Sequence, residues 1–137
     1  MRTGRPLVAA LVAVTATALV GGCADGGARR DAVSGVAVRL LTAAGDGDGA
    51  AACALLAPDT VAALERSAGA SCAKAILDED LPAPTDVRRV DVYGQWARVV
   101  LAGDTEFLAA FPGGWRVVAA GCRSRGERPY DCVLQGG

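Results

Sequence analysis

Residues 87–120 read VRRVDVYGQWARVVLAGDTEFLAAFPGGWRVVAA, and this stretch decides the fold. It contains four runs of alternating or β-branched residues, at positions 87–93, 95–101, 105–111 and 115–120. Short breaks rich in glycine separate the runs, and breaks of this length suit β-hairpins. The stretch therefore predicts a four-stranded antiparallel meander.

Alternation gives each predicted strand two faces, because successive side chains point to opposite sides. Trp96 and Arg98 share one face of the second strand, and Trp115 shares a face of the fourth with Val117. Aromatic side chains at such positions usually pack in the core, and this is the role that we favour for them. The alternative is a ligand cavity between helices and sheet. Its candidate lining consists of four residues: Tyr93, Trp96, Arg98 and Trp115.

The segment before the strands has helical periodicity. Asp31 is a candidate N-cap, because its carboxylate can accept hydrogen bonds from the free amides of a first turn. Apolar residues then recur at spacings of three and four, which predicts an amphipathic helix that ends at Gly45. Residues 45–49 read GDGDG and are expected to form a loop. A calcium loop in this place would need oxygen ligands at positions 50 and 57, and both are alanine.

Three shorter helices are predicted between this loop and the strands. The first covers residues 50–56 and can be opened by Asp48 or Gly49. The second covers residues 58–67 and is stopped by Gly69. The second begins with proline, which suits a first helical turn because that turn leaves its amides unpaired. Ser71 is the N-cap candidate of the last helix. These helices are rich in alanine, and we expect them to cover the more apolar face of the sheet.

Together these elements predict an α+β fold in which N-terminal helices pack on a C-terminal four-stranded antiparallel meander. Helices followed by a twisted meander resemble the small cone-like α+β domains of the nuclear-transport-factor-2-like and cystatin-like group. The resemblance covers residues 31–121 and is architectural, without a shared motif. It implies a curved sheet that wraps one long helix and leaves a cavity at its mouth. Enzymes of that group usually place a histidine or paired acids there, and because this chain has no histidine, no catalytic residue is carried over.

Residues 1–22 have the three parts of a secretory signal peptide. Arg2 and Arg5 precede an uncharged apolar run at residues 7–20, and two glycines follow it. The run is shorter than the roughly 20 residues that a helix needs to cross a bilayer, so a cleaved signal is favoured over a membrane span. The arginines are not adjacent, which favours export in the unfolded state over the twin-arginine route.

Val20, Gly21, Gly22 and Cys23 end this segment. The segment resembles a bacterial lipoprotein signal peptide, whose lipobox places an aliphatic residue and two small residues before a cysteine. The resemblance implies that Cys23 is lipidated, becomes the new N-terminus and holds the protein on the outer face of the cell membrane. A plain thiol beside an ordinary cleavage site is the alternative. The single lysine and the heavy use of alanine, valine and glycine are similar to proteins of high-GC Gram-positive bacteria.

Cleavage before Cys23 divides the chain into three parts. These are the signal peptide at 1–22, a lipidated, glycine-rich tether at 23–30 and a single α+β domain at 31–137. So short a tether keeps the domain near the membrane, and it brings Arg29 and Arg30 within reach of anionic headgroups, unless the pair merely solvates a linker. The mature chain loses two of 14 basic residues and keeps 15 acidic ones, a net charge of about −3. We therefore expect no nucleic-acid binding.

Four cysteines remain after Cys23: Cys53, Cys72, Cys122 and Cys132. An even number in an exported chain suggests two disulfides, and four cysteines allow three pairings. We favour Cys53 with Cys72 and Cys122 with Cys132, because each pair falls within one half of the chain. The second bond would close a polar loop over residues 123–131. A metal site is the alternative, but the chain has no histidine and no CxxC motif, so we expect no metal.

No familiar catalytic constellation is visible in the sequence. Nucleophilic catalysis by serine or cysteine most often uses a histidine base, and the chain has none. The one acidic cluster, residues 78–80, precedes two prolines and is more typical of a solvated linker. The sequence predicts a monomeric, non-catalytic protein without a cofactor, held to membrane lipid through Cys23 beside an envelope or membrane protein partner. The alternative function is small-ligand binding between helices and sheet.

Overall fold

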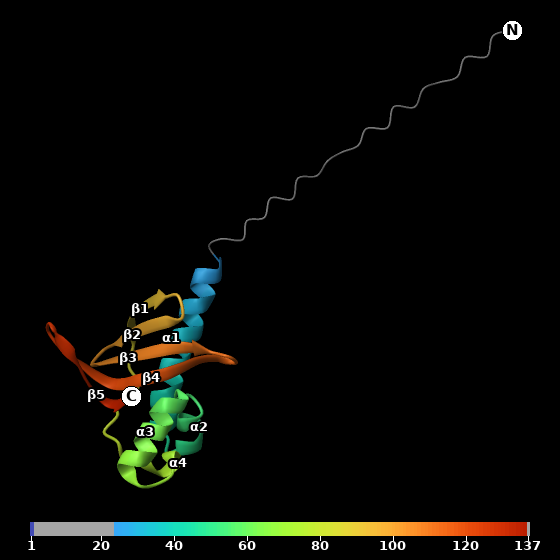
Figure 1. Ribbon diagram of the computed structural model, residues 1–137. Coiled ribbons are helices and arrows are strands. Elements are labelled where there is room, and N and C mark those ends of the chain that lie inside the picture. The colour runs from blue at the N-terminus through green and yellow to red at the C-terminus, as the bar shows by residue number, and fades with distance from the viewer. Residues whose placement is uncertain (2–23, 137) are drawn as a thin grey trace.

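The computed structural model of the chain describes Met1 and residues 24–136. Residues 2–22 of the predicted signal peptide, and Cys23 with its predicted lipid, lie outside the described residues. The fold is α+β, as predicted, with a helical N-terminal part followed by an antiparallel sheet (Figure 1).

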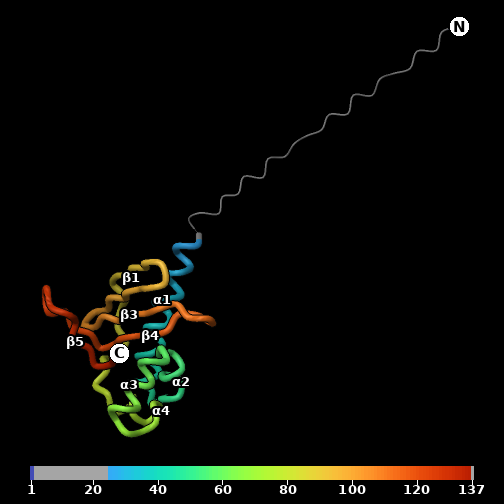
Figure 2. Tube along the Cα trace, viewed as in Figure 1, coloured from blue at the N-terminus to red at the C-terminus, as the bar shows by residue number. Residues whose placement is uncertain are grey.

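The helical part contains α1 (Ala24–Gly45), α2 (Gly49–Cys53), α3 (Pro58–Ala68), α4 (Cys72–Ala75) and the 3-10 helix η1 (Ile76–Asp78). The sheet has five strands in the order of the sequence: β1 (Val87–Tyr93), β2 (Trp96–Leu101), β3 (Asp104–Phe111), β4 (Gly114–Arg125) and β5 (Arg128–Gln135). Helix α1 crosses one face of the sheet, and the short helices lie together at the C-terminal end of α1 (Figures 1 and 2).

The core lies between α1 and the sheet. On α1 the predicted apolar stripe is buried, with Val33 and Leu40 each 0% exposed. On the sheet, Val99, Leu108 and Val117 are each 0% exposed and belong to the same hydrophobic cluster. Burying one such side chain contributes about 1.5–3 kcal/mol, so this contact is the main source of stability.

The predicted start of α1 at Asp31 is wrong, because the helix begins seven residues earlier, at Ala24. Residues 24–30, interpreted as a glycine-rich tether, are therefore helical. Once the buried stripe nucleates a helix, each added residue gains one backbone hydrogen bond while only its own dihedral angles are fixed, whereas nucleation fixes three residues for one bond. Asp25 in the first turn adds a favourable charge at the positive end of the helix dipole. These two terms outweigh the low helix propensity of Gly26 and Gly27.

The short helices lie where the sequence predicts them, although α2 ends at Cys53 and not at residue 56. Asp48 caps α2 by accepting from the Ala51 amide at 2.9 Å, and Gly69 ends α3 in the left-handed conformation with φ 64°. Ser71 precedes α4 but does not cap it with its side chain. The carboxylate of Glu65 does this instead, since its Oε1 accepts from the Cys72 amide at 2.9 Å.

The bond between Cys53 and Cys72 joins α2 to α4 and is one of the two disulfides in the favoured pairing. The two helices pack backbone against backbone at this point. A Cβ on Gly49 would lie 1.9 Å from the Ala73 carbonyl oxygen, so only glycine fits there.

The prediction of four strands and a polar loop over residues 123–131 is wrong. Strand β4 continues to Arg125, and the chain turns and pairs back as β5. Cys122 and Cys132 face each other across this ladder and form the second disulfide. The charged residues of the hairpin concealed the strand, because their side chains are mostly exposed and leave no apolar alternation.

The expectation that the aromatic residues of β1 and β2 pack in the core is also wrong. The helix-facing residues are Ala97, Val99 and Leu101, which are at most 3% exposed. Trp96 is 60% exposed and Tyr93 is 62% exposed, so the favoured core-packing role is wrong for these two aromatics. Trp115 is half-buried and packs against the core cluster.

Candidate functional site

The four predicted ligand-lining residues do not converge on one cavity. Tyr93 and Trp96 pair across β1 and β2, and Arg98 lies on the same outer face of the sheet. Trp115 lies on the opposite, helix-facing side. Its ladder partner Ala110 follows the buried core residue Leu108 by two residues, so Ala110 and Trp115 share the face of Leu108.

Arg98 is held in an ion-pair network on the outer face. Its Nη2 lies 2.8 Å from Oδ2 of Asp91, and the Nε of Arg89 lies 2.8 Å from Oδ1 of the same carboxylate. Hydrogen bonds from Arg98 and then from Arg89 lower the pKa of Asp91, and the bond to Asp91 raises the pKa of Arg98. Both guanidinium groups are thus already paired, which leaves Arg98 little freedom to recognise a ligand.

A groove of about 470 Å³ lies beside Trp115, between α1, the connection from α2 to α3 and the start of β4. The connection is tied to β4 by two backbone hydrogen bonds of 2.8 Å, from the Val117 amide to Leu55 and from the Ala57 amide back to Val117. The side chains of Val36, Leu55 and Trp115 give the groove apolar walls. The groove lies between helices and sheet, and of the four predicted lining residues it contains Trp115 alone.

Three arginines surround Trp115 in and beside this groove. The guanidinium of Arg29 lies 5.7 Å from the Trp115 ring centroid, in cation–π range. Arg116 donates to the Ala54 carbonyl oxygen. The side chain of Arg39 runs along α1 toward Gly35. Its Nη1 lies 3.2 Å from the position that a Cβ on Gly35 would occupy. No carboxylate is among the residues that line the groove, so it suits a ligand with an anionic group and an apolar part.

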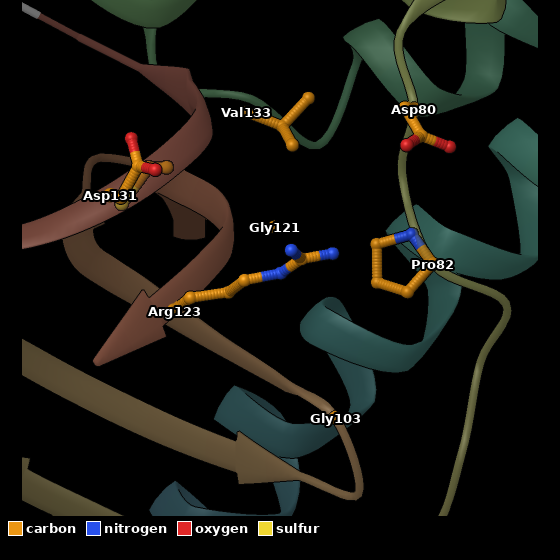
Figure 3. Close-up of a pocket in the computed structure, with 8 residues that line it drawn as sticks. Asp80, Pro82, Gly103, Gly121, Arg123, Asp131 and Val133 are labelled. Atoms are coloured by element: carbon orange, nitrogen blue, oxygen red, sulfur yellow. The ribbon is translucent and has the colours of Figure 1, made fainter. Parts of the chain in front are cut away.

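A second, more polar cleft of about 290 Å³ opens between β4, β5 and the segment that leads into β1. Arg123 reaches across it toward Pro82, and the carboxylates of Asp131 and Asp80 stand at its sides (Figure 3). Its one cysteine, Cys132, is held in the disulfide. The cleft therefore offers charges of both signs but no side chain prepared for nucleophilic attack.

Two carboxylates are buried in the core near the start of β3. Asp104 is 5% exposed, and its Oδ1 accepts from the Cys122 amide at 2.9 Å, while its Oδ2 has no partner. Glu106 is 0% exposed, and neither of its carboxylate oxygens has a hydrogen-bond partner. An ionised carboxylate in this position would be very unfavourable.

The protonation of both groups is shifted by this burial. Burial raises the pKa of Asp104, although backbone amides, first that of Cys122, oppose the shift. Burial, and secondarily the charge of Asp104, raises the pKa of Glu106 well above its ordinary value. Glu106 therefore holds its proton at a pH where an exposed glutamate is ionised.

Neither the burial of Glu106 nor the placing of arginines at the groove was predicted from the sequence. A signal for Glu106 was present, because it alternates with Leu108 on β3 and so shares the face of that core residue. No local signal could have found Arg39 and Arg116, since the contact between α1 and the start of β4 joins distant segments. Within the described residues, no three histidine, cysteine or acidic side chains lie together as metal ligands would.

No protein-family model, no curated protein and no solved structure matches this chain. Among the helices that the structure describes, none combines the length and apolar character needed to cross a membrane.

We predict that Glu106 makes the protein less stable as the pH rises. The folded state keeps a proton that the unfolded state releases above the ordinary pKa of 4.5. The free energy of unfolding should therefore fall by about 1.4 kcal/mol per pH unit above that value, and level off once the pH exceeds the folded pKa. Urea unfolding at a series of pH values measures this slope.

The variant Glu106→Gln should lose most of the slope and be more stable than the wild type at pH 8. Glu127→Gln is the matched control, because Glu127 is an exposed glutamate at the turn between β4 and β5. A wild-type stability that rises steadily over the same pH range would contradict the assignment.

Proposed function

We propose that this protein is an extracytoplasmic lipoprotein, anchored through Cys23 on the outer face of the cell membrane, with a non-catalytic accessory role. The observation that carries the proposal is the position of Cys23. It follows the lipobox residues and directly precedes Ala24, the first residue of α1. A lipid there would be joined to the core of the domain without an intervening linker.

The disulfides support the compartment. Cys53 pairs with Cys72 and Cys122 pairs with Cys132, so every cysteine among the described residues is oxidised. Disulfides of this kind persist outside the cytosol and are rare within it. The organisation into a signal peptide, a lipidated N-terminus and one monomeric domain is part of the same proposal.

An accessory role fits the chemistry of the described surface. The polar cleft is lined by Arg123 and two aspartates but places no base beside a free hydroxyl or thiol. A role beside an envelope or membrane protein requires only a folded surface that is held close to the membrane, within reach of that partner. We therefore place the partner of this protein in or on the same membrane.

The kinship with the nuclear-transport-factor-2-like and cystatin-like group also belongs to the proposal. It is supported by the single long helix α1 lying across a meander of antiparallel strands (Figure 1). A cone-like form would place its mouth beside the groove at Trp115, where α1 and the start of β4 separate.

A second candidate function is small-ligand binding in that groove. Its volume of about 470 Å³ lies within the range of small-molecule sites, and arginines line it without an opposing carboxylate. The ligand class that fits is an amphiphilic anion.

Lipidation makes a direct prediction for the native protein. Its N-terminal tryptic peptide should begin at Cys23 and carry the mass of a diacylglyceryl group, because the lipobox cysteine is the acceptor. Cys23→Ala should remain unprocessed and lose the lipid mass, whereas Cys53→Ala, a disulfide cysteine, should keep it. A mature N-terminus at another residue, or an unmodified Cys23, would contradict the proposal.

Ligand binding predicts a saturable change in Trp115 fluorescence when dodecanoate is added to Trp96→Phe, which leaves Trp115 as the reporter. Losing a charged hydrogen bond is worth about 1.5–3 kcal/mol, so Arg39→Gln should weaken binding about tenfold or more. Dodecanol, which lacks the negative charge, should bind no better to the wild type than to Arg39→Gln. Equal binding of acid and alcohol would rule out an anion site.

A further inference from the structure

Three large aromatic side chains project from the sheet at one end. Tyr93 ends β1, Trp96 begins β2 and Phe111 ends β3, so antiparallel pairing places them at the same end of the sheet. Trp96 pairs with Tyr93 and with Ala109, and Phe111 follows Ala109 by two residues, so all three share the outer face. They are 62%, 60% and 37% exposed. We name Tyr93, Trp96 and Phe111 the aromatic tip.

The aromatic tip is fixed beside the start of α1. The guanidinium of Arg29 donates to the Gly94 carbonyl oxygen in the turn between β1 and β2. The same guanidinium stacks over Trp115 at the start of β4, at 5.7 Å. One α1 side chain therefore contacts both hairpins that carry the aromatic tip. Both hairpin turns lie on the side of the sheet along which α1 passes (Figures 1 and 2).

The distance from Cys23 to this contact is short. Arg29 lies six positions after Cys23. An α-helix rises about 1.5 Å per residue, so six positions correspond to about 9 Å. The headgroup layer on one side of a bilayer is about 5–8 Å thick. A domain anchored at Cys23 can therefore bring the aromatic tip to the membrane surface by a modest tilt of α1.

The charges at the start of α1 do not provide the attraction. Arg29 and Arg30 are balanced by Asp25 and Asp31 in the same two turns. Arg29 is moreover engaged by Gly94 and Trp115. Headgroup binding by the arginine pair, which the sequence suggested, is thus weak, and the exposed rings are the stronger feature. Tryptophan and tyrosine favour the membrane interface because each joins an apolar ring to a polar group.

We infer that the aromatic tip inserts into the phospholipid headgroup layer of the membrane to which Cys23 is anchored. This inference rests on the proposed function, since the lipid on Cys23 brings the tip to that surface. Insertion covers the most exposed aromatic side chains of the described domain and fixes its orientation. The face that carries the polar cleft is then held at a constant angle to the membrane.

The test uses the native lipidated protein with Trp115→Phe, so that Trp96 is its sole tryptophan. The protein is reconstituted in phosphatidylcholine vesicles with and without bromine on the upper part of the acyl chains. Mass spectrometry of the same preparation establishes whether Cys23 carries lipid. Trp96 emission should shift to the blue and fall about twofold or more in the brominated vesicles. Adding phosphatidylglycerol should leave this quenching unchanged, because the contact is aromatic.

The matched control moves the tryptophan to the far end of the domain. Leu77 on η1 is 43% exposed and follows α4, which lies opposite the start of α1 (Figure 1). In a variant with Trp96→Phe, Trp115→Phe and Leu77→Trp, the emission should be the same in both vesicles.

Each other outcome overturns the inference in a distinguishable way. A lipidated Cys23 with unquenched Trp96 refutes the aromatic contact and leaves the proposed function intact. Quenching that appears only with phosphatidylglycerol assigns the contact to the arginines. A blue shift without bromine quenching means that a protein surface, such as a second copy, covers the tip. An unlipidated Cys23 refutes the proposed function and the inference together.

Discussion

The packing of α1 across the sheet is the contact on which the rest of the structure depends. The helix buries Val33, Leu40 and Leu41 against strands whose facing residues are likewise inaccessible. The short helices add Ala52, Leu64, Cys72, Ala75 and Ile76 to this core, and so contribute fewer large apolar side chains than α1. The disulfide between Cys53 and Cys72, with a sequence separation of 19, compensates by about 3 kcal/mol in the chain-entropy account. Helix α1 thus organises the core, and the disulfide holds the remaining helices to it.

Glu106 works against this packing. Its side chain occupies a core position between strands but gains no hydrogen bond, and its neighbour Asp104 satisfies only one oxygen. The protein accommodates the pair by keeping Glu106 protonated, because a neutral carboxyl is far less unfavourable than an ion in an apolar setting. The core is therefore more tolerant of mildly acidic than of alkaline surroundings.

The sequence was most informative where local chemistry decides the structure. Alternation gave β1 with its correct bounds, and Asp48 and Gly69 marked helix ends because caps and left-handed turns depend on one residue. It was least informative where distant segments meet. The fifth strand is held by β4 and a disulfide rather than by an apolar pattern, and residues 24–30 are helical because the buried stripe extends the helix. The groove could not be foreseen, since it joins α1 to β4.

Because α1 starts at Ala24, directly after Cys23, and its apolar stripe is buried in the domain, a lipid anchor at Cys23, as proposed, would be connected to the core without a linker. The domain should then lie against the membrane instead of moving freely above it. Neutron reflectometry of the lipidated protein on a supported bilayer measures this directly. The account predicts one protein layer of about 35 Å, the diameter of a domain of this size, in contact with the headgroups. A water layer between protein and headgroups, or a thick and diffuse protein layer, would contradict it.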